Sequence, residues 1–266
     1  MNRIPSISDS RHPEEVRLYH DLAILYDEIM HGVDYEDWTD YIDTLIQLHH
    51  PGAVDILEIA CGTGTMALEL ERFGDYRITA TDRSPEMIRI ARQKARQRQS
   101  QVTWDVQDMR TLSFDQPFDI VFMVFDSLNY LHEPSDIQRL FSSVHHQLKT
   151  DGRFLFDFTT PNFSPRIAPE LNEKRKIRDG YEYTRESRYD DLEKIHINHF
   201  HVLKRNTMTG HIVQRFEEVH RQRIWSYDEM LEMASRSPLH MEAAYEDFDF
   251  SDASSNSDRI TMVLRK

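Results

Sequence analysis

The chain has 266 residues, of which 39% are hydrophobic and 29% are charged, and its formal net charge at pH 7 is −14. This composition is that of a folded globular protein and excludes a disordered one, and the length allows one large domain or one domain with a sizeable insertion. A strongly negative protein repels phosphate backbones, so the charge disfavours a nucleic-acid substrate and suits a neutral or cationic small molecule.

The single cysteine, Cys61, excludes an intramolecular disulfide and a metal site built from several cysteines. No apolar stretch approaches the roughly 20 residues that span a bilayer, and none lies near the N-terminus as a signal peptide requires. We therefore expect a cytoplasmic protein without a membrane segment.

The first 160 residues predict two leading helices followed by an alternation of apolar strands and helices. Apolar residues at helical spacing predict two leading helices, over 14–30 and 36–49, before strands and helices begin to alternate. The predicted strands cover 54–60, 76–82, 101–106, 118–125 and 153–159, and the predicted helices cover 65–73, 84–98 and 135–149. Nearly continuous apolar strands separated by helices are typical of a parallel sheet covered on both faces.

The alternation stops at Pro161. We expect residues 161–178 to be irregular, whereas three extended stretches after them predict an antiparallel sheet inserted behind the fifth core strand. A helix, opened by a capping box at Ser226 and Glu229, and two final strands then complete the core. The extended stretches cover 181–189, 194–204 and 211–224, the helix 226–236, and the final strands 239–250 and 258–265. The fold class is thus α/β: a Rossmann-like, seven-stranded, mostly parallel sheet with a reversed final strand, plus an inserted antiparallel β-sheet.

A glycine loop follows the first predicted strand. Gly62 and Gly64 allow a ligand to approach the backbone closely, and the N-terminus of the next helix offers N–H groups to a negative group. Asp82 follows Gly64 by eighteen residues and ends the next strand, where a carboxylate faces ribose hydroxyls in such folds. Asp108 and Met109 follow the third strand, within reach of an adenine. The pattern indicates a nucleoside lying across the carboxyl ends of the strands.

Four segments, EIACGTG, TDRSPEMI, QDMR and FDIVFMVF, resemble in order and spacing the motifs of the class I S-adenosylmethionine-dependent methyltransferases. The resemblance covers about residues 50–160 and 226–266 and implies S-adenosylmethionine as cofactor and S-adenosylhomocysteine as product. It departs from the family at Ala60, where the first glycine of the loop is expected. The cofactor-binding residues that it implies are Glu58, Ala60, Gly62, Gly64, Asp82, Arg83, Met87, Asp108, Met109 and Phe125.

Further segments resemble a subgroup that methylates amines and hydroxyls of small molecules; they are LYDEIM, DSLNYL, DFTTPNF and EEVHRQRIW. This resemblance implies that residues 1–50 form lid helices over the cofactor, with Tyr26 near the methyl group and Trp38 at the carboxylate end of the cofactor. Residues 51–160 and 226–266 would form the cofactor-binding core, and 161–225 the inserted sheet that shapes the substrate pocket. The alternative is that both aromatic residues only pack in the core.

The reaction needs alignment of nucleophile, methyl group and sulfur, and a base if the acceptor is an alcohol or a protonated amine. Tyr26, Asn129 and His220 are the catalytic candidates, because histidine suits a base near neutral pH and Asn129 follows the fourth strand. Tyr130, Arg221 and Arg223 are further candidates for positioning the substrate. His196, His199 and His201 share a predicted strand, but no carboxylate partner stands out, so we expect no metal.

Several alternatives stay open. The loop also fits the G-x-G-x-x-A pattern of a nicotinamide dinucleotide dehydrogenase, with Asp82 as its acidic partner. Glu58, four residues ahead of Gly62, and the reversed final hairpin favour the methyltransferase. A tRNA or protein methyltransferase and a non-catalytic binding or assembly module are further alternatives. The inserted sheet could also mediate a homodimer.

Overall fold

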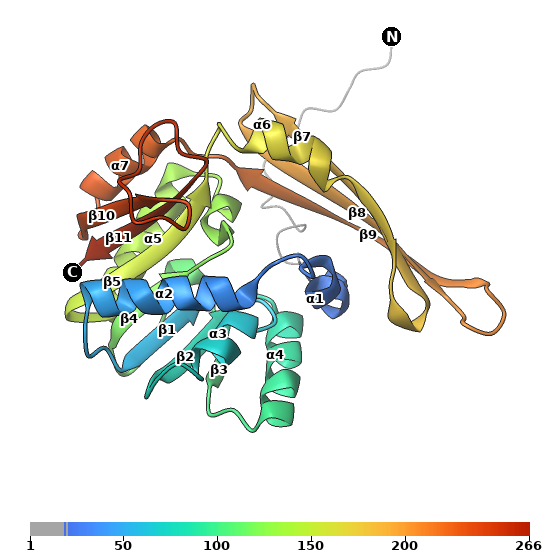
Figure 1. The fold of residues 1–266 in the computed structure, drawn as a ribbon, viewed down its shortest axis with the longest axis horizontal. Coiled ribbons are helices and arrows are strands. Elements are labelled where there is room, and N and C mark those ends of the chain that lie inside the picture. The colour runs from blue at the N-terminus through green and yellow to red at the C-terminus, as the bar shows by residue number, and fades with distance from the viewer. Residues whose placement is uncertain (1–18, 20) are drawn as a thin grey trace, which may run out of the picture.

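The core is one mixed sheet. The structure, a computed structural model, describes residue 19 and residues 21–266. The strands of this sheet are β1 (Asp55–Ile59), β2 (Arg77–Asp82), β3 (Thr103–Val106), β4 (Phe118–Met123), β5 (Leu148–Thr159), β10 (His240–Glu246) and β11 (Arg259–Arg265). They lie in the order β10-β11-β5-β4-β1-β2-β3 (Figure 1), and β11 alone runs antiparallel to both of its neighbours. The predicted seven-stranded, mostly parallel sheet with a reversed final strand is confirmed.

Helices cover both faces of this sheet. Side chains of α2 (Tyr35–His49), α3 (Thr65–Leu70) and α4 (Pro85–Arg98) form one buried apolar cluster with the strands. Those of α5 (Pro134–Gln147) and α7 (Tyr227–Ser235) form a second cluster against the other face. Ser84 caps α4, and the capping box at Ser226 and Glu229 opens α7, as their sequences predict.

A second sheet is inserted between β5 and α7. It is antiparallel, in the order β6-β7-β8-β9, with β6 (Glu173–Lys176), β7 (Tyr181–Asp190), β8 (Ile195–Arg205) and β9 (Ile212–Arg223). Figure 1 shows its long strands reaching away from the core. The expectation of irregular chain over 161–178 is wrong at α6 (Ser164–Ile167), at the 3₁₀ turn η4 (Ala168–Leu171) and at β6. The prediction of three extended stretches missed β6, which is a charged edge strand with no buried residue, so its sequence lacks an apolar alternation.

Two short helices replace the described part of the first predicted helix. They are η1 (Leu22–Leu25), a 3₁₀ turn, and α1 (Tyr26–Ile29), and the start predicted at residue 14 lies outside the described residues. Leu22 and Leu25 pack against Tyr183 and Phe200 of the inserted sheet. The apolar spacing of this segment therefore serves contact with that sheet.

Across the part of the chain that the structure describes, none of the helices has the length and apolar character needed to cross a bilayer.

Candidate active site

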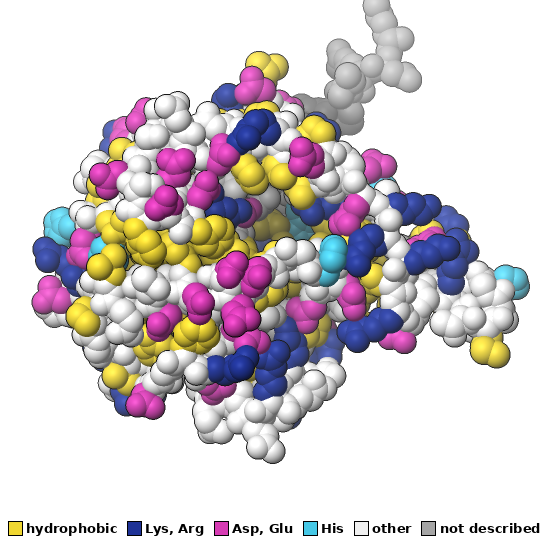
Figure 2. Space-filling model, viewed as in Figure 1, with side chains coloured by type: hydrophobic (Ala, Val, Ile, Leu, Met, Phe, Trp, Pro, Cys, Tyr) yellow, Lys and Arg dark blue, Asp and Glu magenta, His cyan; other side chains and the backbone are white. Residues whose placement is uncertain are grey.

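A cavity of about 380 Å³ lies at the carboxyl ends of the core strands, where β1 and β4 are neighbours. This is the point where the strand order reverses and where open α/β sheets bind ligands. The leading helices and the inserted sheet complete its wall. Figure 2 shows a hollow near the middle of this face, with hydrophobic side chains on its rim.

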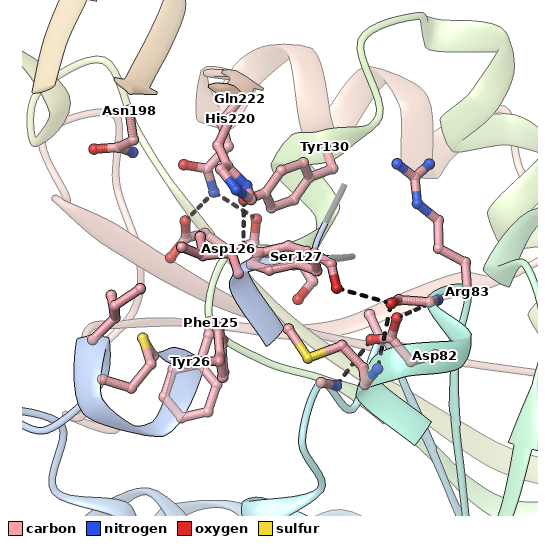
Figure 3. Close-up of a pocket in the computed structure, with 18 of the residues that line it drawn as sticks. Tyr26, Asp82, Arg83, Phe125, Asp126, Ser127, Tyr130, Asn198, His220 and Gln222 are labelled. Atoms are coloured by element: carbon pink, nitrogen blue, oxygen red, sulfur yellow. Dashed lines mark hydrogen bonds between the residues drawn. The ribbon is translucent and has the colours of Figure 1, made fainter. Parts of the chain in front are cut away.

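Asp82 organises one end of the cavity. Its Oδ2 accepts a hydrogen bond from the Gly62 amide at 2.9 Å and its Oδ1 accepts one from the Ser84 amide at 2.8 Å. Burial raises the pKa of the Asp82 carboxyl, although these N–H donors oppose the shift. The carboxylate thus ties the glycine loop to β2 and still borders the cavity beside Arg83, where a ribose would need an acceptor (Figure 3).

The two glycines of the loop have different roles. Gly62 has a φ of +54° and borders the cavity, and a Cβ there would lie 3.5 Å from the Tyr26 ring. Gly64 has a φ of +77°, and a Cβ there would lie 2.3 Å from the Trp104 ring. Gly64 lies outside the cavity lining and lets Trp104 pack under the loop, so the cofactor-binding role predicted for Gly64 stays a prediction, which it would fulfil through the shape of the loop.

The predicted adenine residues line the cavity together. Met87, Asp108 and Met109 all border it. Asp108 is paired with Arg110, whose Nη2 donates to Oδ2 at 2.6 Å. Burial acts to raise the pKa of Asp108, but the hydrogen bonds from Arg110 outweigh it and the pKa is lowered. Asp108 therefore stays ionised and can accept a hydrogen bond from an adenine amino group.

Aromatic rings form the opposite end. Phe125 lies with its ring centroid 4.6 Å from that of Trp38, and both residues border the cavity with Tyr26. Phe125 and Asp126 have φ values of 60° and 49°, a conformation that costs a non-glycine residue about 1–3 kcal/mol. Ion pairing of Asp126 with Arg259 at 3.0 Å helps to hold it. Aromatic faces beside carboxylates favour a sulfonium cation.

Glu58 lies beneath the glycine loop and not on the cavity wall. It is 2% exposed, and its Oε2 has no hydrogen-bond partner among the described residues. Burial raises the pKa of this carboxyl well above its usual range. A buried acceptor without a partner fits the amino group of a bound amino-acid moiety, reached directly or through water.

Polar side chains from three parts of the chain line the other wall: Tyr19 precedes η1, Tyr130 ends the 3₁₀ turn η3 (Ser127–Tyr130), and His220 lies on β9. The hydroxyls of Tyr19 and Tyr130 lie 2.6 Å apart, and the Tyr130 hydroxyl lies 2.9 Å from Nδ1 of His220. Oε1 of Glu218 approaches Nε2 of His220 at 3.1 Å, without the alignment of a hydrogen bond. Figure 3 shows Tyr130 and His220 side by side, across the cavity from Asp82 and Tyr26. His220 thus lines the same cavity as Asp82 and Tyr26.

Asn129 is buried between two strands and lies away from the cavity. Its side chain is 0% exposed, donates to the Arg223 carbonyl at 2.7 Å and accepts from the Thr159 amide at 3.4 Å. It therefore joins β9 to β5 and lies outside the cavity lining, so its contacts are structural and the catalytic role predicted for Asn129 stays a prediction without a contact to the cavity. Its neighbour Tyr130 occupies the cavity instead.

Several cavity residues were missed by the sequence predictions. The ones with polar side chains include Tyr19, Asp126, Arg185, Asn198, Gln222 and Arg259. Gln222 stands two residues after His220, so strict alternation along β9 places the two on one face, a signal that was available. Arg185 and Asn198 needed the strand register, which the sequence does not contain.

These features together define a class. An α/β sheet with a reversed last strand, a glycine loop, a carboxylate at the end of the second strand and a nucleoside-sized cavity is the fold and site of a class I S-adenosylmethionine-dependent methyltransferase. The family model described as a methyltransferase domain matches residues 56–152. The chain is 32% identical to “Putative methyltransferase YqeM” of Bacillus subtilis (strain 168) over 94% of this chain and 97% of that protein.

Solved structures share the fold. An S-adenosylmethionine-dependent methyltransferase from Clostridium acetobutylicum superimposes with a TM-score of 0.74 at 24% identity, over 93% of this chain and 98% of that one. The sugar N-methyltransferase KedS8 from Streptoalloteichus gives 0.70 at 19% identity, over 100% and 99%. The chain belongs to the class I S-adenosylmethionine-dependent methyltransferases, and its cofactor is S-adenosylmethionine.

Proposed function

We propose that this methyltransferase transfers the methyl group to an amine or hydroxyl of a small molecule bound between the inserted sheet and the cofactor. The observation that carries the proposal is the position of Tyr130 and His220 in the cavity wall, on the side away from Asp82. S-adenosylmethionine supplies the methyl group as an activated sulfonium. The residues of the chain then have to align the acceptor, exclude water and remove one proton.

The hydrogen-bonded chain from Tyr19 through Tyr130 to His220 supports proton removal. Burial raises the pKa of Tyr130, so its phenol stays protonated near neutral pH. A proton from the acceptor nitrogen or oxygen would reach the Tyr130 oxygen while the proton of Tyr130 passes to Nδ1 of His220, 2.9 Å away. Glu218 would stabilise the imidazolium that forms. His220 is the terminal base in this scheme and Tyr130 the group that touches the acceptor.

Arg185 supports a finer proposal about the acceptor. It borders the cavity, its Nε donates to Asn198 at 2.9 Å, and it has no ion-pair partner among the described residues. Burial lowers the pKa of its guanidinium, which reflects the cost of a desolvated charge without a carboxylate. An acceptor that carries a carboxylate or phosphate would offset that cost, so we propose an anionic group on the acceptor despite the negative charge of the whole protein.

An acceptor screen tests the proposal. The protein would be incubated with methyl-labelled S-adenosylmethionine and matched pairs of amines and alcohols, amino sugars among them, each with and without a carboxylate or phosphate. We expect labelled small-molecule products from the anionic members, lost with Arg185→Gln. Labelling of tRNA or protein together with no small-molecule product would contradict the proposal; products from the uncharged members alone would contradict only the role of Arg185.

A further inference from the structure

A second group of chemistry-bearing side chains lies on the inserted sheet, on the face away from the cavity. Side chains alternate between the faces of a strand, and Asn198 and Phe200 line the cavity, so His199 and His201 of β8 point outward. The strand register then adds a carboxylate on each side: Glu186 of β7 pairs with His199, and Glu217 of β9 pairs with His201. The sequence shows two histidines without a partner, and the sheet supplies two carboxylates.

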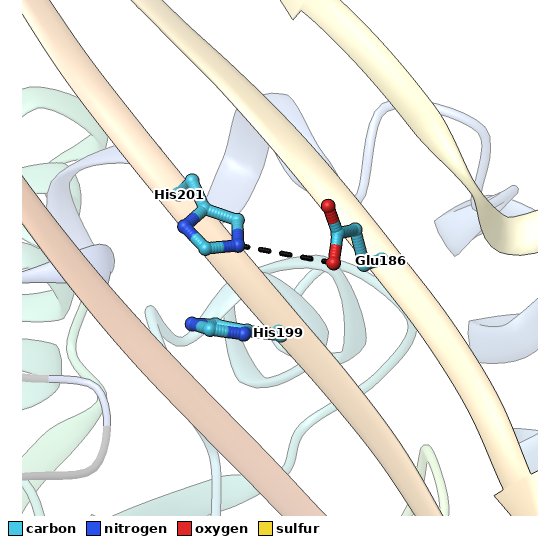
Figure 4. A group of neighbouring side chains, drawn as sticks. All are labelled: Glu186, His199 and His201. Carbon is cyan, nitrogen blue, oxygen red and sulfur yellow. Dashed lines mark ion pairs between the residues drawn. The ribbon is translucent and has the colours of Figure 1, made fainter.

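The spacing of the polar atoms suits a metal ion. Glu217 lies 3.3 Å from Nε2 of His199 and 3.2 Å from Nδ1 of His201, and Glu186 lies 4.0 Å from Nε2 of His201. One ligand atom from each of Glu186, His199 and His201 lies within 4.8 Å of the other two. Figure 4 shows these three side chains next to one another on the sheet. Two ligands about 2.1 Å from a tetrahedral zinc ion are roughly 3.4 Å apart, so these three side chains need to rotate toward one another to hold an ion. Glu217 faces Nδ1 of His201 while Glu186 faces Nε2, so Glu217 has to move further to complete the site.

The charges around this group also favour a cation. Neither Glu186 nor Glu217 forms an ion pair with a lysine or arginine among the described residues; their nearest partners are the two imidazoles. Two carboxylates therefore lie beside two imidazoles whose nitrogens can act as metal ligands. The side chains of His199 and His201 are 31% and 35% exposed, so an ion can reach them from solvent.

We propose that Glu186, His199, His201 and Glu217 form a binding site for a divalent zinc-type ion. Two imidazoles and two carboxylates suit Zn²⁺, whereas Mg²⁺ and Ca²⁺ require oxygen ligands throughout. A bound ion joins β7, β8 and β9, the strands that carry Arg185, Asn198 and His220 on their other face. The site is structural, because the sheet separates it from the cavity. It replaces the sequence-based expectation that the chain holds no metal.

The test uses zinc chloride as the probe and the full chain, freed of any affinity tag and of metal by a chelator. Calorimetry should give one Zn²⁺ per chain with micromolar affinity, and His199→Gln or His201→Gln should each weaken it at least tenfold. Co²⁺ at the same site should show the visible absorption of a tetrahedral complex. His145→Gln is the matched control, since His145 and His146 are also neighbouring histidines, on α5, and should leave binding unchanged.

Thermal unfolding provides a readout that does not depend on calorimetry. Zn²⁺ should raise the melting temperature of the wild type and of His145→Gln, and should leave that of His201→Gln unchanged. Equal zinc affinity in the wild type and in the double variant His199→Gln, His201→Gln would overturn the proposal, as would the absence of saturable binding. The affinity for S-adenosylmethionine should be the same in all of these variants, so a failure here leaves the proposed function untouched.

Discussion

Asp82 combines two functions in one carboxylate, since it fixes the Gly62 amide and borders the cavity. Asp82→Ala removes the proposed ribose acceptor, and a hydrogen bond to a charged group is worth about 1.5–3 kcal/mol. We therefore expect S-adenosylmethionine to bind roughly 10- to 100-fold more weakly by calorimetry. Asp115→Ala, an exposed carboxylate in the turn before β4, is the control. Unchanged affinity in Asp82→Ala would rule out the ribose assignment.

His220 is the residue on which the proposed proton transfer depends. His220→Gln keeps a polar side chain in the wall but removes the base, and general-base catalysis contributes about 10²- to 10⁴-fold to a rate. We expect kcat to fall within that range for an acceptor found in the screen, with the affinity for S-adenosylmethionine unchanged. His211→Gln, in the exposed turn before β9, should behave as the wild type. A variant that loses cofactor affinity along with kcat would indicate a role in folding of the site instead.

The loop between β1 and α3 requires glycine at position 64, because a larger residue there leaves no room for the Trp104 ring. A Cβ at Gly64 would collide with Trp104, whereas a Cβ at Gly52, which also has a positive φ of +87°, would meet no atom within 4 Å. Gly52→Ala thus measures the backbone cost alone, about 1–2 kcal/mol. Gly64→Ala should lose about 1–3 kcal/mol more through overpacking, measured by urea unfolding. Equal losses in the two variants would show that Trp104 moves aside freely.

The pairing of β5 with β11 buries a second carboxylate, and its titration affects stability. Burial raises the pKa of Asp157 to about 6, while the Arg259 charge opposes the rise and the Asp126 charge adds to it. The unfolded pKa is about 3.9, so between about pH 4 and 6 the folded state binds more protons than the unfolded state. This group therefore lowers the free energy of unfolding as the pH rises through that window.

Asp157→Asn removes this titration. Urea unfolding between pH 4.5 and 6.5 should show that the free energy of unfolding of the variant, relative to that of the wild type, increases with pH. The measured quantity is the difference in slope, so a constant offset caused by the substitution does not affect it. Parallel curves for the two proteins would contradict the raised pKa.

At the scale of elements, the periodicity of apolar residues was sufficient to predict the helices and strands of the core, each of which has a buried face. The strands and helices of the core follow from apolar patterns, and Ser84 and Ser226 mark helix starts through local hydrogen bonds that need no tertiary context. β6 has no buried face, so its sequence shows no apolar alternation from which a strand could be predicted. The glycine loop and Asp82 were predictable for the same local reason, since motif spacing along the chain fixes them. Arg185, Glu186 and Glu217 acquire their partners from the register between strands, which one sequence does not specify.

At the scale of the whole molecule, the net charge is strongly negative, whereas the charge that borders the cavity is mixed. Asp82, Asp108 and Asp126 line the cavity together with four arginines, and Arg110 pairs with Asp108 while Arg259 pairs with Asp126. The aromatic rings of Tyr26, Trp38 and Phe125 border the same cavity and favour the cationic sulfonium of S-adenosylmethionine.

Parallel calorimetric titration with S-adenosylmethionine, S-adenosylhomocysteine and NADH tests this account most directly. We predict micromolar binding of both sulfur nucleosides at one site per chain, no binding of NADH, and loss of nucleoside binding in Asp82→Ala. Binding of NADH alone would contradict the account and would mean that the glycine loop serves a dinucleotide.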